Sequence, residues 1–324
     1  MTTLSDIKKP VKSEMTEFEA YFNRVMQSEV PFVRLLLNHI LRKKGKQMRP
    51  LLVFLSAKLN GEVNESTYVA ASLIELLHTA TLVHDDVVDD ARERRGIPTI
   101  NAIWNSKIAV LIGDFLLAQG LLISVNKKTY RMLATTSGAV QEMISGELIQ
   151  MQKTRSLNIK EEDYFKVIRK KTAALISACT TCGAVSATQD ESVIARMKEF
   201  GDAVGIAFQI KDDLLDYNSN GLTGKKEGND IREKKITLPL IYALEKSTLI
   251  EKRKIIRTIR KKNKSREDIR SVINFVKKYK GLEYAEQAMA CYRSQALELL
   301  STYPDSDVKE SLIRFVIYTT EREK

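Results

Sequence analysis

The clearest regularity in the chain is a spacing of apolar residues that fits α-helices. In residues 164–181, apolar side chains return every third or fourth position, the period of a helix with one buried face. No proline falls between Pro98 and Pro239, and convincing alternation of apolar and polar residues between turn signals is missing. The pattern therefore predicts an all-α protein.

Breaks in the helical pattern are short, and none has the composition of a domain linker. They fall at residues 59–66, 94–98 and 217–230. Several helices are apolar on all sides, which is typical of central helices in a large bundle or of helices at a subunit interface. We therefore expect one all-α domain spanning residues 1–324, built as an antiparallel helix bundle.

The chain has 324 residues and a net charge of +11, and this basic excess favours anionic partners. Phosphorylated small molecules, nucleic acid and a membrane surface are the candidate classes. Much of the excess lies in residues 251–266, which we interpret as a solvated helical face. The basic stretches lack interleaved aromatic residues and any recognised nucleic-acid motif, so no nucleic-acid partner is expected.

The cysteines and the N-terminus bear on where the protein works. Cys179, Cys182 and Cys291 are an odd number, which argues against a disulfide scaffold and for a reducing compartment. The first two form a CxxC inside an apolar helical pattern, and we expect buried side chains rather than a zinc site. Residues 1–14 lack the apolar core of a signal peptide, and the apolar run 108–123 is short and interrupted. We expect a cytoplasmic protein without stable membrane insertion, although transient membrane contact for product release is compatible with this.

Two distant segments carry aspartates at helical spacing. In DDVVDD (85–90), Asp85 and Asp89 are four residues apart, so their carboxylates share one face of a helix. QIKDDLLDY (209–217) has the same kind of spacing within another apolar helix, where charges are normally paired or metal-bound. Mg²⁺ takes one or two carboxylates and fills its shell with water and phosphate oxygens. We therefore predict that both clusters face one cavity and hold a diphosphate through shared Mg²⁺ ions.

Basic residues near these clusters are candidates for direct diphosphate binding. Lys46 and Arg49 lie within one helical turn after a glycine, and Arg94 and Arg95 follow the first acid cluster. Arginine binds phosphate through two parallel hydrogen bonds, whereas lysine acts as a mobile point charge. Further candidates are Lys171, Thr172, Lys225 and Lys235. The set indicates two diphosphates, one held through metal and one held mainly by Arg and Lys.

These motifs, in this order, resemble those of the trans-isoprenyl diphosphate synthases, or polyprenyl synthetases. The similar segments are GKQMRP, LLHTATLVHDDVVDDARERRGIPTIN, GDFLLAQG, KTAALISACTTCGA, GIAFQIKDDLLDY and TGKKEGNDIREKKITLPLIYAL. The resemblance covers about residues 40 to 245, and the paired DDxxD motifs carry most of its specificity.

The resemblance implies a bundle around a deep central cavity, usually a homodimer, with Mg²⁺ as cofactor. It also implies the substrates, isopentenyl diphosphate and an allylic diphosphate, and the reaction, ionisation followed by condensation and elimination. Metal neutralises charge on the leaving diphosphate in such a reaction. Each turn of the reaction makes a trans-polyprenyl diphosphate one isoprene unit longer.

The resemblance also assigns roles to residues. The metal ligands would be Asp85, Asp89 and Asp212, supported by Asp86, Asp213 and Asp216. The allylic diphosphate would contact Arg94, Lys171, Thr172, Gln209, Lys225 and Lys235, and isopentenyl diphosphate would contact Lys46, Arg49, His78 and Arg95. One departure from the family pattern is Glu233-Lys234-Lys235, where a glycine is often found. It leaves open which of these two lysines reaches phosphate, and we choose Lys235.

Product length is expected to depend on the wall of the cavity one turn before Asp85. The nearest residues there are Ala80 and Thr81, both small, whereas short-chain members of the family typically carry an aromatic plug. We therefore expect products of roughly six to eight isoprene units, the size of a quinone side chain. Residues of the next helix, such as Ile112, could set the floor instead.

Three other interpretations remain at this stage. A short-chain synthase that makes farnesyl or geranylgeranyl diphosphate would share every catalytic motif. A non-catalytic subunit of a heteromeric synthase would have lost its acids, but both clusters are intact here. A terpene cyclase would share the ionisation step, but Lys46, Arg49 and Arg95 would be superfluous in it.

Overall fold

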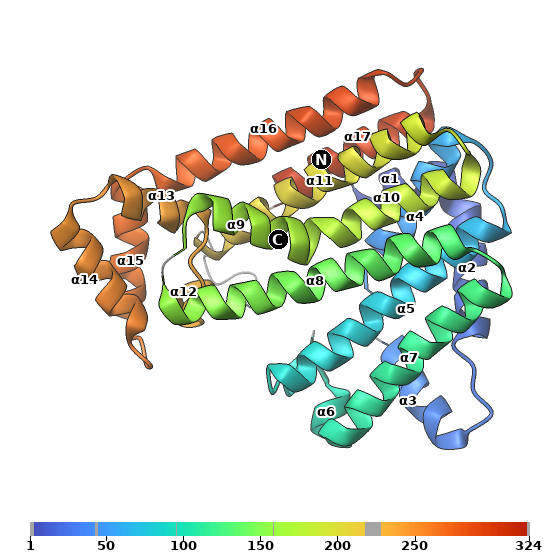
Figure 1. Cartoon of the computed structure of the whole chain (residues 1–324), viewed down its shortest axis with the longest axis horizontal. Coiled ribbons are helices and arrows are strands. Elements are labelled where there is room, and N and C mark those ends of the chain that lie inside the picture. Colours follow the sequence, from blue (N-terminus) through green and yellow to red (C-terminus); the bar gives the residue numbers. More distant parts are fainter. Residues whose placement is uncertain (1–2, 43–44, 95, 158, 218–227, 323–324) are drawn as a thin grey trace.

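Helices make up almost all of the regular structure in the computed structural model, which describes residues 3–42, 45–94, 96–157, 159–217 and 228–322 (Figure 1). Two short strands, β1 (Glu93–Arg94) and β2 (Ile97–Pro98), form an antiparallel pair in which Arg94 lies opposite Ile97. The predicted all-α fold is confirmed.

The helices lie in chain order and are joined by short connections. The first half comprises α1 (Leu4–Lys8), the 3₁₀ turn η1 (Lys9–Val11), α2 (Lys12–Val25), α3 (Pro31–Leu41), α4 (Met48–Asn60), α5 (Glu65–Val88), α6 (Ile100–Ile103), α7 (Ser106–Asn126) and α8 (Tyr130–Ser156). The second half comprises α9 (Glu161–Ile168), the π-helical turn η2 (Arg169–Ala173), α10 (Ala174–Ala187), α11 (Glu191–Tyr217), α12 (Asn229–Arg232), α13 (Leu238–Lys246), α14 (Leu249–Arg260), α15 (Arg266–Lys278), α16 (Gly281–Ser301) and α17 (Asp307–Glu321).

The centre of the bundle is packed closely because small residues line the helix contacts. A Cβ atom on Gly183 of α10 would lie 2.4 Å from the carbonyl oxygen of Val53 in α4, so only glycine permits this approach. Cys179 and Cys182 lie on the same helix and are fully buried, as the sequence predicted. Burial raises the pKa of the Cys179 thiol to about 12, so it stays protonated and packs as a small apolar group.

The helices that carry the acid clusters end on the same side of the molecule. In Figure 1, α5, α8 and α11 all run from right to left, and their C-terminal ends lie toward α12. A capping box fixes the start of α5, where Asn64 accepts a hydrogen bond from the Ser66 amide and donates its own amide to Thr67. The first acid cluster therefore occupies the last turn of α5, and the second occupies the last turns of α11.

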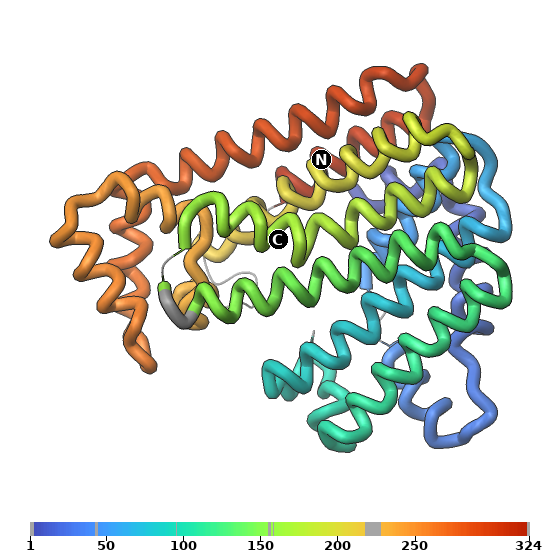
Figure 2. The backbone as a smooth tube through the Cα atoms, in the orientation of Figure 1, coloured from blue at the N-terminus to red at the C-terminus, as the bar shows by residue number. Residues whose placement is uncertain are grey.

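The left end of the molecule is built from the last third of the chain. Figure 2 shows α16 running along one edge of the bundle, and α14 and α15 projecting beside its start. Buried apolar residues of α12 to α15, including Ile231, Ile259 and Val272, form a core of their own with α11 and α13. This second core attaches the α14–α15 pair to the end of the bundle where the acid clusters lie.

Among the described residues, two helices are long and apolar enough to cross a membrane by length and composition alone. They are α5, whose apolar window is 61% buried within the protein, and α7, whose window is 33% buried. The central helix of a helical bundle meets the same criterion. The expectation that the chain does not insert stably into a membrane stays a prediction.

Candidate active site

A pocket of about 700 Å³ brings together most of the residues predicted to bind isopentenyl diphosphate. Lys46, Arg49 and His78 all line it, as does Arg94, which follows the first acid cluster. The ammonium group of Lys46 donates a hydrogen bond of 3.0 Å to the hydroxyl of Tyr318 and lies 5.5 Å from the centre of its ring. The pocket therefore presents several cationic side chains from three separate parts of the chain.

The first acid cluster divides into one buried and three exposed carboxylates. Asp86 is buried and accepts a hydrogen bond of 2.7 Å from the guanidinium of Arg94. Asp85 and Asp89 are exposed at the end of α5, where the helix dipole disfavours negative charge. Partial burial beneath the neighbouring helices, and then the charge of Glu147, raise the pKa of Asp85. These two carboxylates are therefore available to a cation.

The second acid cluster has a similar division. Asp213 is buried, and it accepts hydrogen bonds from the Tyr164 hydroxyl at 2.7 Å and the Gln209 amide at 2.8 Å. Burial, and then the charge of Asp230, raise its pKa to about 8. Asp212 is partly exposed and pairs with Arg322 at 2.9 Å. Asp212 is therefore more accessible to solvent than Asp213.

Asp216 holds the next segment of the structure in place. Its two carboxylate oxygens accept hydrogen bonds from the backbone amides of Asn229 at 2.9 Å and Asp230 at 3.0 Å. Burial, and then the charge of Asp216, raise the pKa of Asp230 to about 6. Lys235 lies close by and pairs with Glu233 at 2.6 Å. This pairing keeps the predicted phosphate-binding lysine beside the second cluster.

The π-helical turn η2 places two predicted diphosphate contacts on the wall between the clusters. Lys171 donates a hydrogen bond of 2.8 Å to Gln150 of α8 and forms an ion pair with Glu147. Thr172 donates to the side-chain oxygen of Gln209 at 2.7 Å. Lys171, Thr172 and Gln209, which the sequence assigned to one substrate, thus belong to one hydrogen-bonded wall.

Several contacts tie the two acid clusters to a common space. Arg322, the partner of Asp212, lines the same pocket as Asp86 and Arg94. Its guanidinium also lies 4.3 Å from the centre of the Phe208 ring, and its Nε is buried without a hydrogen-bond partner among the described residues. In addition to the effect of burial, the charge of Glu147 on α8 raises the pKa of Asp85 and the charge of Lys171 on η2 lowers it. Both clusters therefore open onto one region rimmed by cations.

The family of the chain follows from a comparison of its sequence with known families. Residues 30–276 match the polyprenyl synthetase family. This chain belongs to that family. The resemblance drawn from the motifs is confirmed, and the chain is an enzyme of the trans-prenyltransferase class.

Individual relatives match this polyprenyl synthetase over nearly its whole length. An all-trans-nonaprenyl-diphosphate synthase (geranyl-diphosphate specific) from Rhodobacter capsulatus is 35% identical, and the match covers 98% of this chain and 97% of the relative. A solved polyprenyl synthase from Caulobacter crescentus, in complex with calcium and isoprenyl diphosphate, has a TM-score of 0.90 at 31% identity, covering 99% and 98%. A geranylgeranyl pyrophosphate synthase from Bacteroides thetaiotaomicron has a TM-score of 0.83 at 37% identity, covering 98% and 99%.

The acid clusters of this polyprenyl synthetase suit a divalent cation that arrives with its substrate. Among the described residues, no three His, Cys, Asp or Glu side chains are grouped closely enough to hold a metal ion by themselves. Mg²⁺ is commonly bound by one or two carboxylates together with substrate phosphates. The exposed carboxylates at the negative end of α5 and the partly exposed Asp212 near the end of α11 fit that mode, because a cation there relieves both mutual repulsion and the unfavourable helix dipoles.

The placement of the remaining predicted residues differs from case to case. Asp86, Asp213 and Asp216 bond to protein groups, which favours their supporting role over direct metal ligation. Thr81 is half-buried and donates to the carbonyl of His78 at 2.8 Å, whereas Ala80 is fully buried in the core. Arg95 and Lys225 lie outside the described residues.

Sequence reasoning missed several residues of this site. Arg322 lies two residues from the end of the printed chain, where no motif marks it. Glu147 and Gln150 lie on the inner face of α8, and Tyr164 lies on α9, each far from any recognised motif. A search for polar residues on otherwise apolar helix faces would have found Glu147 and Gln150. Arg322 is brought to the site only by the folding of the chain.

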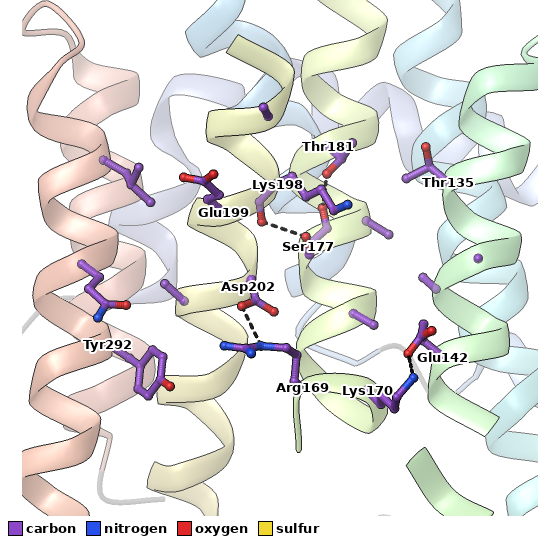
Figure 3. A pocket seen from close by; sticks show the side chains of 18 of the residues that line it. Thr135, Glu142, Arg169, Lys170, Ser177, Thr181, Lys198, Glu199, Asp202 and Tyr292 are labelled. Atoms are coloured by element: carbon purple, nitrogen blue, oxygen red, sulfur yellow. Dashed lines mark hydrogen bonds and ion pairs between the residues drawn. The ribbon is translucent and has the colours of Figure 1, made fainter. Parts of the chain in front are cut away.

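A hollow larger than the cationic pocket lies elsewhere in the described part of the molecule, and the sequence did not point to it. This groove of about 1630 Å³ lies between α8 and α16, over α10 and α11 (Figure 3). Four of its charged side chains form two ion pairs, Arg169 with Asp202 at 3.1 Å and Lys170 with Glu142. None of the predicted site residues lines it. Because the acids and the cationic pocket lie on the other side of η2, we place the active site there.

Proposed function

We propose that this enzyme condenses isopentenyl diphosphate with an allylic diphosphate to make a trans-polyprenyl diphosphate of roughly six to eight isoprene units. The whole chain would act as one catalytic domain in the cytoplasm. The observation that carries the proposal is the pair of acid clusters, at the ends of α5 and α11, beside one pocket with several cationic side chains. Family membership and the relatives that make long products support it.

Each group of residues would hold one part of the substrates. Asp85, Asp89 and Asp212 would hold Mg²⁺, which supplies positive charge to the departing diphosphate. Lys171, Arg94 and Lys235, with Thr172, Gln209 and Lys225, would bind the allylic diphosphate. Lys46, Arg49, His78 and Arg95 would bind isopentenyl diphosphate, so that its double bond faces the allylic carbon.

The proposed reaction has three steps, which differ in where charge develops. The bond between the allylic carbon and the diphosphate oxygen breaks, and the electron pair leaves with the diphosphate. The double bond of isopentenyl diphosphate attacks the allylic cation and forms the new carbon–carbon bond. A proton is lost from the carbon beside the new cation, which restores an allylic double bond. Fixed cations such as Lys171 and Arg94 stabilise the charge that develops on the leaving group.

Product sizing tests this proposal directly. We expect the purified chain, incubated with farnesyl diphosphate, isopentenyl diphosphate and Mg²⁺, to release products of thirty to forty carbons, with activity lost when a chelator removes the metal. Activity of the chain alone would also exclude the non-catalytic subunit. Activity that survives exhaustive chelation would contradict the metal assignment.

A short-chain product is the second candidate, and one comparison favours it. The geranylgeranyl pyrophosphate synthase of Bacteroides thetaiotaomicron shares 37% of the residues of this chain. Against it stand the small side chains of Ala80 and Thr81, at positions where short-chain members typically carry an aromatic plug. Accumulation of only fifteen- or twenty-carbon product in the same assay would favour the short-chain candidate.

We also propose that two copies of the chain associate through α7 and α8. The outer face of α7 exposes Leu111 at 63% and Leu122 at 55%, and α8 exposes Leu148 at 62%. Such a contiguous apolar stripe on adjacent helices is typical of a subunit interface. Asp114, itself exposed, lies within the stripe on α7, and a charge there fits a protein interface better than a lipid one.

A double substitution tests this homodimer. Leu111→Glu/Leu122→Glu is expected to convert a dimer into a monomer, because both charges would be buried against the partner. Light scattering on a sizing column gives the mass of each form. Leu249→Glu, at an exposed leucine of α14, is the matched control and should stay dimeric. A native protein that is already monomeric, or a double variant that remains dimeric, would rule out this interface.

A further inference from the structure

Helix α14 presents an outward face that the proposed reaction does not use. Ile255 and Ile259 face inward and are buried in the second core, which fixes the orientation of the helix. At 100° per residue, the opposite face carries Ile250, Arg253 and Arg257. Helix α14 lies at the left end of the molecule (Figure 1).

On its inward side, α14 is joined to α15 by an ion pair and hydrogen bonds of Glu251. Glu251 forms an ion pair with Lys278 of α15 at 2.6 Å and accepts hydrogen bonds from the hydroxyls of Tyr279 and Thr248. These hydrogen bonds lower the pKa of Glu251 to about 2. The only acid of the helix is thereby committed to α15, and it does not neutralise the outward cations.

The outward face combines strong positive charge with exposed apolar side chains. Residues 249–264 contain eight Lys or Arg residues and one acid, Glu251, so they hold more than half of the net charge of +11. Within the described part of the chain, no ion pair involves Lys252, Arg253, Lys254, Arg257 or Arg260. At the start of the same helix, Leu249 is 73% exposed and Ile250 is 81% exposed.

The face is connected to the active site through short contacts. Lys264 donates a hydrogen bond of 3.1 Å to the carbonyl of Arg232 at the end of α12. The backbone amides at the start of α12 in turn bind Asp216 of the second acid cluster. A surface that binds α14 would therefore lie at the end of the molecule where the acid clusters lie.

We propose that the outward face of α14, formed by Leu249, Ile250, Arg253, Arg257 and Arg260, docks on a bilayer of anionic phospholipid. Cations would bind the headgroups, while the two apolar side chains enter the interface. The inference rests in part on the proposed long-chain product, whose hydrocarbon tail partitions into lipid rather than water. Nucleic acid fits less well, because residues 249–264 contain no aromatic side chain for stacking on bases.

Vesicle flotation tests the proposal without any substrate. The purified full chain is mixed with vesicles of phosphatidylcholine alone, or with vesicles in which phosphatidylglycerol replaces half of it. We expect about tenfold more protein to float with the anionic vesicles, and added salt to abolish the difference, because exposed charges are screened. Equal flotation with both vesicles, or preferential binding to a DNA duplex over anionic vesicles, would overturn the proposal.

Matched variants separate this face from general charge effects. Arg253→Glu/Arg257→Glu should lose flotation, and Leu249→Ser/Ile250→Ser should reduce it several-fold. Lys12→Glu/Lys128→Glu, the same change of charge at exposed positions toward the other end of the molecule, should float like the native protein. Prenyltransferase activity in detergent should be unchanged in all three variants. Failure of flotation with normal activity would reject α14 docking alone, whereas an inactive native chain would reject the proposed function.

Discussion

Replacing Asp85 by asparagine is expected to lower the rate of condensation roughly a thousandfold, which corresponds to about 4 kcal/mol of transition-state stabilisation. Asp85 is an exposed carboxylate at the end of α5, and the substitution keeps its size while removing the charge that would hold a cation. Steady-state turnover with farnesyl and isopentenyl diphosphates measures the effect. The concentration of Mg²⁺ needed for half-maximal activity should rise as well.

The matched control for this substitution is Asp90→Asn in the same cluster. Asp90 follows the helix, is exposed, and has a positive φ of 48°, a conformation that asparagine adopts readily. No metal role is proposed for Asp90, so the activity of the Asp90→Asn enzyme should stay within about twofold of the native activity. Equal losses of activity in both variants would mean that the total negative charge near the site controls the rate, rather than metal binding by Asp85.

Replacing Ala80 by phenylalanine is expected to shorten the product to fifteen or twenty carbons. Ala80 lies on α5 one turn before Asp85, on the path that a growing hydrocarbon would follow. Because Ala80 is fully buried, the ring must either fill a hollow or displace its neighbours, and over-packing costs about 1–3 kcal/mol of stability. Chromatography of the dephosphorylated products gives their length, and thermal unfolding shows whether the variant is folded.

Thr81→Val is the control for that experiment. Valine has nearly the size of threonine, and only the hydrogen bond from Thr81 to the His78 carbonyl is lost. Product length should therefore not change. A folded Ala80→Phe enzyme that still makes long products would show that another wall, such as Ile112 on α7, limits the chain.

Local sequence was sufficient for the all-α fold and for the helical faces on which the acids lie, whereas the roles assigned to the site residues stay predictions. A spacing of three and four residues places side chains on one helical face, so DDVVDD and QIKDDLLDY determine their own geometry once the helices form. Packing of η2 against α8 and α11 then bonds Lys171 to Gln150 and Thr172 to Gln209.

The parts that the sequence could not predict depend on contacts between distant residues. The apolar spacing of α11 places Asp213 nearer the buried face than Asp212, but it does not identify the partner of that carboxylate. Only the packing of α9 brings the Tyr164 hydroxyl to Asp213. Arg322 is 110 residues from Asp212 along the chain, so their pairing has no local signature.

The π-helical turn η2 joins α9 to α10 and affects how the side chains of these two helices are oriented relative to each other. A π turn holds one residue more than a regular turn, so it shifts the rotational phase of everything after it. Within this turn Lys170 bonds to Glu142 in the outer groove, whereas Lys171 bonds to Glu147 and Gln150. Because the turn also sets the rotational phase at which α10 begins, deletion of one of its residues would turn the buried face of α10 away from α4 by about 100°.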